Sequence, residues 1–131
     1  MTKIIPIPRE TDETARLIVD GAFKVHSSLG PGLIESVYEA CLSYELEKKG
    51  LKVRRQVVVP VIYDGQNMDA DLRLDLLVND HVIVELKAVE KIIPLHSAQL
   101  LTYFMLSNKR LGLLINFNVP LIKEGIKRLV L

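Results

Sequence analysis

A carboxylate and an ammonium lie two residues apart at the end of an apolar run, in the tripeptide Glu85-Leu86-Lys87. Side chains alternate between the two faces of a strand, so Glu85 and Lys87 should share one face while Leu86 enters the core. A second carboxylate, Asp75, lies in the preceding apolar run. Two carboxylates that converge on one point bind a hard cation such as Mg²⁺ through oxygen. The pattern therefore predicts a metal site built on Asp75 and Glu85, with Mn²⁺ as the alternative ion.

The turn signal Asn79-Asp80 between the two runs indicates a hairpin that would bring Asp75 beside Glu85. A strictly two-residue loop would pair Asp75 with Val84 and place the two carboxylates on opposite faces of the sheet. We therefore predict an odd-length loop or a bulge, because either irregularity returns both carboxylates to one face. The competing interpretation is that these charges are the solvated face of an amphipathic sheet.

Length and composition limit the class of protein. A chain of 131 residues fits one domain that buries about two-thirds of its unfolded surface. Charges interrupt every apolar run before the roughly 18 residues of a membrane span, and the N-terminus has no signal-peptide pattern, so we expect a soluble cytoplasmic protein. The lone Cys41 is expected to be a buried thiol without a catalytic role.

The formal net charge is only +1, which argues against a protein that coats nucleic acid through bulk electrostatics. Local basic clusters, such as the one in residues 48–55, leave room for phosphate contacts but are also typical of solvated faces. A homodimer would double this basic surface.

Hydrophobic periodicity predicts two helices before the first strand. After an extended arm over residues 1–10, Thr11 is expected to cap a helix over 11–29. A second helix over 34–49 should end before Gly50, which suits the position just after a helix. We expect this second helix to bury Val37, Tyr38, Cys41, Leu42 and Leu46.

Strands and one further helix follow. The strands of an antiparallel meander are expected over 53–61, 72–78 and 82–87, with a turn at Asp64-Gly65 after the first. A helix over 96–107 should turn Leu100, Leu101, Phe104 and Met105 toward the sheet. A buried strand over 111–117 and an edge strand over 126–131 complete the chain. This order predicts an α/β sandwich, a central mixed β-sheet flanked by helices, within one domain over 11–131.

The stretch Gly32-Leu33-Ile34-Glu35-Ser36-Val37-Tyr38 resembles the motif that names the GxxExxY family, a branch of the PD-(D/E)XK nuclease superfamily. Asp75 with Glu85-Leu86-Lys87 matches the central signature of that superfamily, and Leu74 stands where the signature has a proline. The resemblance covers nearly the whole chain from about Thr11. It implies a restriction-endonuclease-like fold and a Mg²⁺-dependent nuclease that hydrolyses phosphodiester bonds, with DNA as the expected substrate.

The resemblance also implies individual roles. Asp75, Glu85 and the backbone carbonyl of Leu86 would hold the metal, and Lys87 would orient the attacking water or stabilise developing negative charge. Glu35 would reach the metal through water or hold a second ion. Favourable charge at a helix N-terminus is the alternative explanation for Glu35.

Gln99 and Tyr103 lie four residues apart on one predicted helical face and resemble the Gln-xxx-Tyr motif of RecB-like nucleases. They would orient the water or a phosphate, with ordinary packing as the alternative. Tyr38 and His26 are candidates to hold Glu35 in position without contacting the metal, although each is also typical of a structural core residue. A non-catalytic module that binds nucleic acid or protein on the same fold is the alternative to an enzyme.

Overall fold

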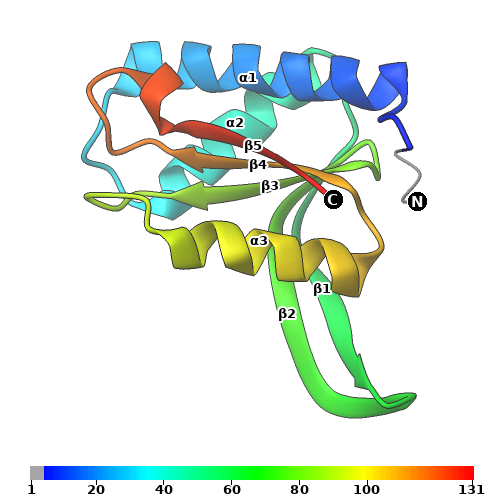
Figure 1. Cartoon of the computed structure of the whole chain (residues 1–131). Helices are drawn as coiled ribbons and strands as arrows, with labels where there is room; N and C mark the ends of the chain where they lie inside the picture. The colour runs from blue at the N-terminus through cyan, green and yellow to red at the C-terminus, as the bar shows by residue number, and fades with distance from the viewer. Residues whose placement is uncertain (1–4) are drawn as a thin grey trace.

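The computed structural model describes residues 5–131. Its five-stranded mixed sheet has the strand order β1-β2-β3-β4-β5, and only β3 and β4 run parallel to each other among these neighbours. Helices α1 and α2 cover one face of the sheet and α3 covers the other (Figure 1). This arrangement confirms the predicted α/β class and the predicted order of helices and strands.

The helices are α1 (Arg9–Leu29), α2 (Glu35–Lys48) and α3 (Pro94–Ser107), with a short 3₁₀ helix η1 (Ile122–Gly125). The strands are β1 (Val53–Tyr63), β2 (Gln66–Val78), β3 (Val82–Lys87), β4 (Leu111–Asn116) and β5 (Ile126–Val130). No helix within residues 5–131 combines the length and the apolarity that a membrane crossing requires.

Helix α1 begins two residues earlier than the sequence predicts. Pro8 precedes Arg9 at the helix start, and its fixed φ suits that position. The prediction that Thr11 caps the helix is wrong, because Thr11 lies inside the first turn and is buried. Thr14 also lies inside the helix, where its hydroxyl donates to the carbonyl of Glu10 at 3.0 Å.

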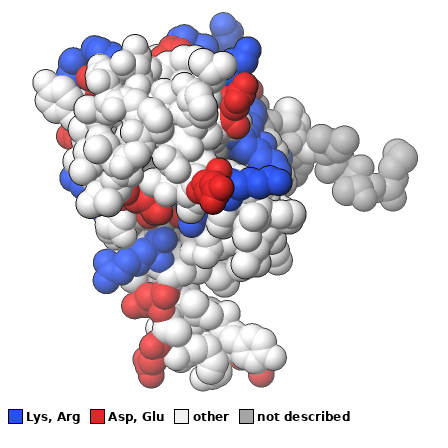
Figure 2. Space-filling model, turned by 90° about the vertical axis from the view of Figure 1, so that its left-hand side faces the viewer, with Lys and Arg blue, Asp and Glu red and all other residues white. Residues whose placement is uncertain are grey.

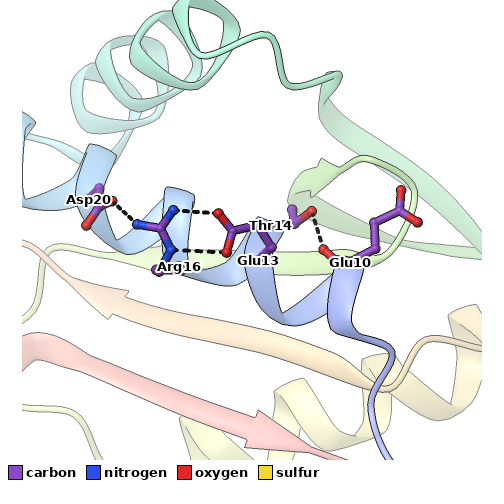
Figure 3. Close-up of polar contacts among 5 residues, drawn as sticks. All are labelled: Glu10, Glu13, Thr14, Arg16 and Asp20. Atoms are coloured by element: carbon purple, nitrogen blue, oxygen red, sulfur yellow. Dashed lines mark hydrogen bonds and ion pairs between the residues drawn. The ribbon is translucent and has the colours of Figure 1, made fainter.

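The exposed face of α1 carries Arg16 between two carboxylates (Figure 3). The guanidinium donates to Glu13 at 2.5 and 3.1 Å and to Asp20 at 3.1 Å, the spacings of neighbours on one helical face. Exposed pairs of this kind contribute little to stability, because water and salt screen them. The helix is therefore held mainly by its buried side, which packs on α2 and the sheet through Ala15, Ile18, Ala22 and Val25.

Helices α2 and α3 rest on the sheet through narrower stripes of buried residues than predicted. In α2 the fully buried residues are Tyr38, Leu42 and Leu46, spaced by four along one face. Val37 and Cys41 precede two of them by one residue, which turns them about 100° around the helix, so Val37 is exposed and Cys41 half-buried. In α3, Leu100 and Phe104 are buried, whereas Leu101 and Met105 follow them by one residue and are exposed. These four predicted core positions are therefore corrected.

The hairpin between β2 and β3 has an odd-length loop. Val78 pairs with Val82, which leaves three loop residues, Asn79, Asp80 and His81. The backbones of Asn79 and Asp80 both have positive φ, a conformation that Asn and Asp tolerate better than most residues. This loop confirms the predicted irregularity, and its register sets Asp75 across from Glu85 instead of Val84.

Beyond the sheet, β1 and β2 continue as a projecting two-stranded arm (Figure 1). The predicted turn at Asp64-Gly65 lies at its tip, but β2 begins at Gln66 instead of residue 72. Residues 62–71 are exposed and so lack the hydrophobic alternation by which a half-buried strand is recognised. Residues 56–72 include three aspartates and no Lys or Arg, and the outer part of the arm accordingly shows only acidic charge (Figure 2).

Candidate active site

The two strands that carry the predicted carboxylates separate at Asp75. The regular pairing of β2 with β3 ends at Leu76 and Val84. Beyond that pair, the backbone N–H of Asp75 donates to Oε1 of Glu85 at 3.1 Å, and the backbone N–H of Leu86 donates to Oδ2 of Asp75 at 2.8 Å. Side chains thus replace the missing backbone pairing, and they fix both carboxylates at the point where β2 leaves β3.

The backbone is irregular on both sides of this point. Leu76 packs in the core under α1 and α2, yet Leu74, two residues earlier, packs in the core under α3. Regular alternation would place these two side chains on one face, so β2 rotates about Asp75. On β1, Gln56 lies opposite Asp75, between the pairs formed by its two neighbours, and has a φ of 51°. A non-glycine residue in the left-handed region stores strain of about 1–3 kcal/mol.

Burial and a neighbouring negative charge control the ionisation of Glu85. Its side chain is enclosed, with only 5% of the residue exposed. Burial, followed by the charge of Asp75, raises the pKa of Glu85 from 4.5 to about 8, while the Asp75 N–H and the Lys87 ammonium act in the opposite direction. No Lys, Arg or His of residues 5–131 forms an ion pair with Glu85. The carboxyl group is therefore protonated at neutral pH unless a cation binds beside it.

Lys87 and Tyr103 approach these carboxylates from two elements. Lys87 is half-buried at the end of β3, and its charge acts on Glu85. Tyr103 is half-buried on α3, where burial first and then the charges of Glu85 and Asp75 raise its pKa. Gln99, exposed one turn earlier on α3, lowers that pKa through a polar contact. The structure thus brings Tyr103 within electrostatic range of the carboxylate pair, with Gln99 beside the Tyr103 hydroxyl.

A pocket of about 370 Å³ opens beside the pair on the α2 side. Glu35, the first residue of α2, is exposed and lines this pocket together with Asp75 and Leu86. Its other lining residues are Ser36, Glu39 and Gln56. Glu35 and Asp75 therefore line the same pocket.

His26 and Tyr38 lie elsewhere. The His26 ring donates from Nε2 to the carbonyl of Val119 at 2.7 Å and ties α1 to the segment before η1. The Tyr38 hydroxyl donates to the Gly30 carbonyl at 2.6 Å and accepts from the Leu33 N–H at 3.1 Å. Neither residue lines the pocket of the carboxylate pair, and both hydrogen bonds of the Tyr38 hydroxyl shape the turn before α2. These contacts are structural and give no support to Glu35 itself.

The sequence interpretation overlooked three polar residues around the site. Glu39 and Asn116 are almost fully buried, and Gln56 lies between Glu39 and Asp75. Two of them could have been found from the sequence, since Glu39 follows Glu35 by one helical turn and Asn116 interrupts an otherwise apolar strand. Asn116 holds the segment after β3 by exchanging two hydrogen bonds with the backbone of Val89, at 2.9 and 3.1 Å. Nothing in the sequence marks Gln56.

The donor set suits a small hard cation. Within residues 5–131 no three His, Cys, Asp or Glu side chains already form a metal cluster. Mg²⁺ does not need one, because it keeps several waters and is usually held by one or two carboxylates. Asp75 and Glu85 supply two carboxylates at one point, and a bound cation would offset the burial and the Asp75 charge that together keep Glu85 protonated. The residues therefore fit a divalent ion.

The sheet is mixed, has helices on both faces, and separates where an acidic pair meets a lysine. These features define an α/β protein of the restriction-endonuclease-like class. The family model of the PD-(D/E)XK nuclease superfamily matches residues 12–129, and the chain belongs to this superfamily. No curated protein and no solved structure matches the chain. Proteins of this superfamily are typically nucleases that use divalent metals, which makes nucleic acid the general class of substrate.

Proposed function

We propose that this protein is a Mg²⁺-dependent nuclease of the GxxExxY branch that hydrolyses phosphodiester bonds in DNA. The observation that carries the proposal is the pairing of Asp75 with Glu85 where the strands separate, with Lys87 beside them. Buried acids with a strongly raised pKa, such as Glu85 at about 8, are concentrated at sites that carry out chemistry.

Asp75, Glu85 and the backbone carbonyl of Leu86 would hold the ion. A bound divalent cation, with Mn²⁺ as a substitute, neutralises charge on the scissile phosphate and makes water more acidic. Lys87 donates a hydrogen bond to the attacking water or to the oxygen on which negative charge develops. The alternation of β3 places this ammonium on the face of Glu85.

Residues from the two flanking helices complete the site. The raised pKa of Tyr103 keeps its phenol protonated, so the hydroxyl can donate to a phosphate oxygen, and Gln99 orients it. Glu35 accepts a hydrogen bond from water across the pocket. Each of these groups acts by orientation, which requires only that its side chain reach the point where β2 leaves β3, from one face of the sheet or the other.

Charge limits the approach of the substrate. The three aspartates of the arm would repel phosphates, so the DNA backbone must lie along the body of the protein. The formal net charge of a single copy is only +1, so its basic side chains barely outnumber its acidic ones. We therefore propose a homodimer, which doubles the basic surface, acting in the cytoplasm.

Cleavage of a DNA panel tests the function directly. Linear, single-stranded, flapped and four-way DNA are incubated with Mg²⁺ or Mn²⁺ and with wild type, Lys87→Ala, Asp75→Ala or the control Arg16→Ala. Arg16 is a control for the loss of a cation, since it is exposed and its partners lie within α1. We expect metal-dependent cutting that both site variants lose, by at least about 100-fold, and the control retains. Binding of DNA without cutting would instead favour the non-catalytic module, for which the low net charge is the main support.

A further inference from the structure

A hydrogen-bonded chain connects α2 to Asp75. Glu39 on α2 is only 7% exposed, and its Oε1 accepts from the Gln56 amide nitrogen at 2.5 Å. The same amide nitrogen lies 3.4 Å from Oδ1 of Asp75. Arg55 binds the other oxygen of Glu39 at 3.0 Å. Two carboxylates from separate elements therefore meet across one amide group.

The chemistry of the amide explains why glutamine suits this position. Two carboxylates at this separation repel each other, whereas an amide nitrogen carries two N–H donors and no charge. One N–H can serve Glu39 and the other Asp75, while the Arg55 guanidinium balances the charge of Glu39. The left-handed backbone of Gln56 is what turns this side chain toward both acceptors. The strain at Gln56 thus coincides with a specific contact to the acidic pair.

Both oxygens of Asp75 are oriented by this arrangement. Oδ2 accepts from the Leu86 N–H, and Oδ1 faces the Gln56 amide. We propose that Gln56, anchored by Glu39, is a positioning residue that holds the Asp75 carboxylate ready for the divalent ion. The inference rests on the metal site of the proposed function. Partners of a ligating carboxylate typically contribute 10–100-fold to metal affinity, about the effect expected here.

Binding of Mn²⁺ alone to the full chain, followed by electron paramagnetic resonance, tests this role without cleavage. Gln56→Leu keeps the size of the side chain but removes both donors, so we expect roughly 10–100-fold weaker binding. Glu39→Ala should cause a similar loss because Gln56 then has no anchor. Glu39→Gln keeps an oxygen that accepts from Gln56 and should stay within about 3-fold of wild type. Arg54→Ala, next to Arg55 on β1 but paired with Asp80, is the matched control and should bind as wild type does.

The possible results separate the two proposals. If wild type binds Mn²⁺ and both Gln56→Leu and Glu39→Ala bind it equally well, Gln56 has no positioning role, although the metal site stands. If Glu39→Gln loses as much affinity as Glu39→Ala, charge and not the hydrogen bond to Gln56 is responsible, and the inference is also overturned. If wild type does not bind Mn²⁺, the metal site fails and the inference fails with it. Should Gln56→Leu not fold, the two Glu39 variants decide the matter, with urea unfolding used to verify that they fold.

Discussion

Replacing Glu85 by glutamine should make the metal-free protein more stable, and increasingly so as the pH rises. The glutamine oxygen can still accept from the Asp75 N–H, as Oε1 of Glu85 does at 3.1 Å. Glutamine therefore resembles the protonated form of Glu85, which the fold prefers because burial and Asp75 raise the pKa to about 8. The variant therefore removes the ionisable group at position 85 and keeps the shape of the side chain.

The sign and size of the effect follow from linkage. In the unfolded chain Glu85 ionises near 4.5, but in the folded protein it keeps its proton up to about pH 8. Folding thus binds a proton between these values, and the stability of the wild type falls as the pH rises from about 4.5 through about 8. With about 1.4 kcal/mol for each pKa unit, the loss from this one group is roughly 3 kcal/mol at pH 7 and approaches about 5 kcal/mol above pH 9.

Urea unfolding in the presence of a chelator measures this difference. Wild type and Glu85→Gln are compared at pH 5, 7 and 9, and the gap in unfolding free energy should widen from about 1 to more than about 3 kcal/mol. Glu47→Gln, an exposed position on α2, is the control and should follow the wild-type curve. Parallel curves for wild type and Glu85→Gln would show that Glu85 is ionised in the metal-free fold, and the electrostatic account of the site would be refuted.

Two further outcomes follow from the same structure. Binding of Mn²⁺ should release about one proton at pH 7 and almost none at pH 9, because the ion displaces the proton of Glu85. Calorimetry in buffers of different ionisation enthalpy counts the released protons. Equal release at both pH values would contradict the raised pKa of Glu85. Tyr38→Phe should lower the unfolding free energy by about 1–3 kcal/mol, since it leaves the Gly30 carbonyl and the Leu33 N–H without their shared partner. Urea unfolding that shows no change would mean that water replaces the hydroxyl in the turn before α2.

The sequence predicted the elements whose pattern is local. Helices and strands of the body follow from their 3.6- and 2-residue periodicity, and the odd-length loop at Asn79 follows from the need to place Asp75 and Glu85 on one face. The start of α1 was missed because Thr11 matches a cap by type, but tertiary packing buries it inside the helix. The outer arm was missed because its strands pair with each other and bury almost nothing, which leaves no hydrophobic alternation to detect.

The surroundings of the site were harder to predict than its acids. Asp75, Glu85 and Lys87 lie in or beside apolar runs, so their charge is conspicuous. Gln56 lies in an exposed stretch of β1, and its contact with Glu39 depends on a left-handed backbone and on the packing of α2 over the strand. Residues that are brought together only by such long-range packing carry no periodic signal.

Three departures from ordinary folding rules coincide around Asp75, at Asp75 itself and at the residues facing it on the two neighbouring strands. The ladder between β2 and β3 stops at Asp75, Gln56 opposite it adopts a left-handed backbone, and Glu85 is buried with a raised pKa. Each departure costs of the order of 1 kcal/mol or more, and a shared location by chance in a chain this short is improbable. Proteins retain such costs where geometry matters more than stability. If the site holds a cation, ion binding recovers part of this free energy, so the ion should stabilise the fold most at the pH values where the metal-free protein is weakest.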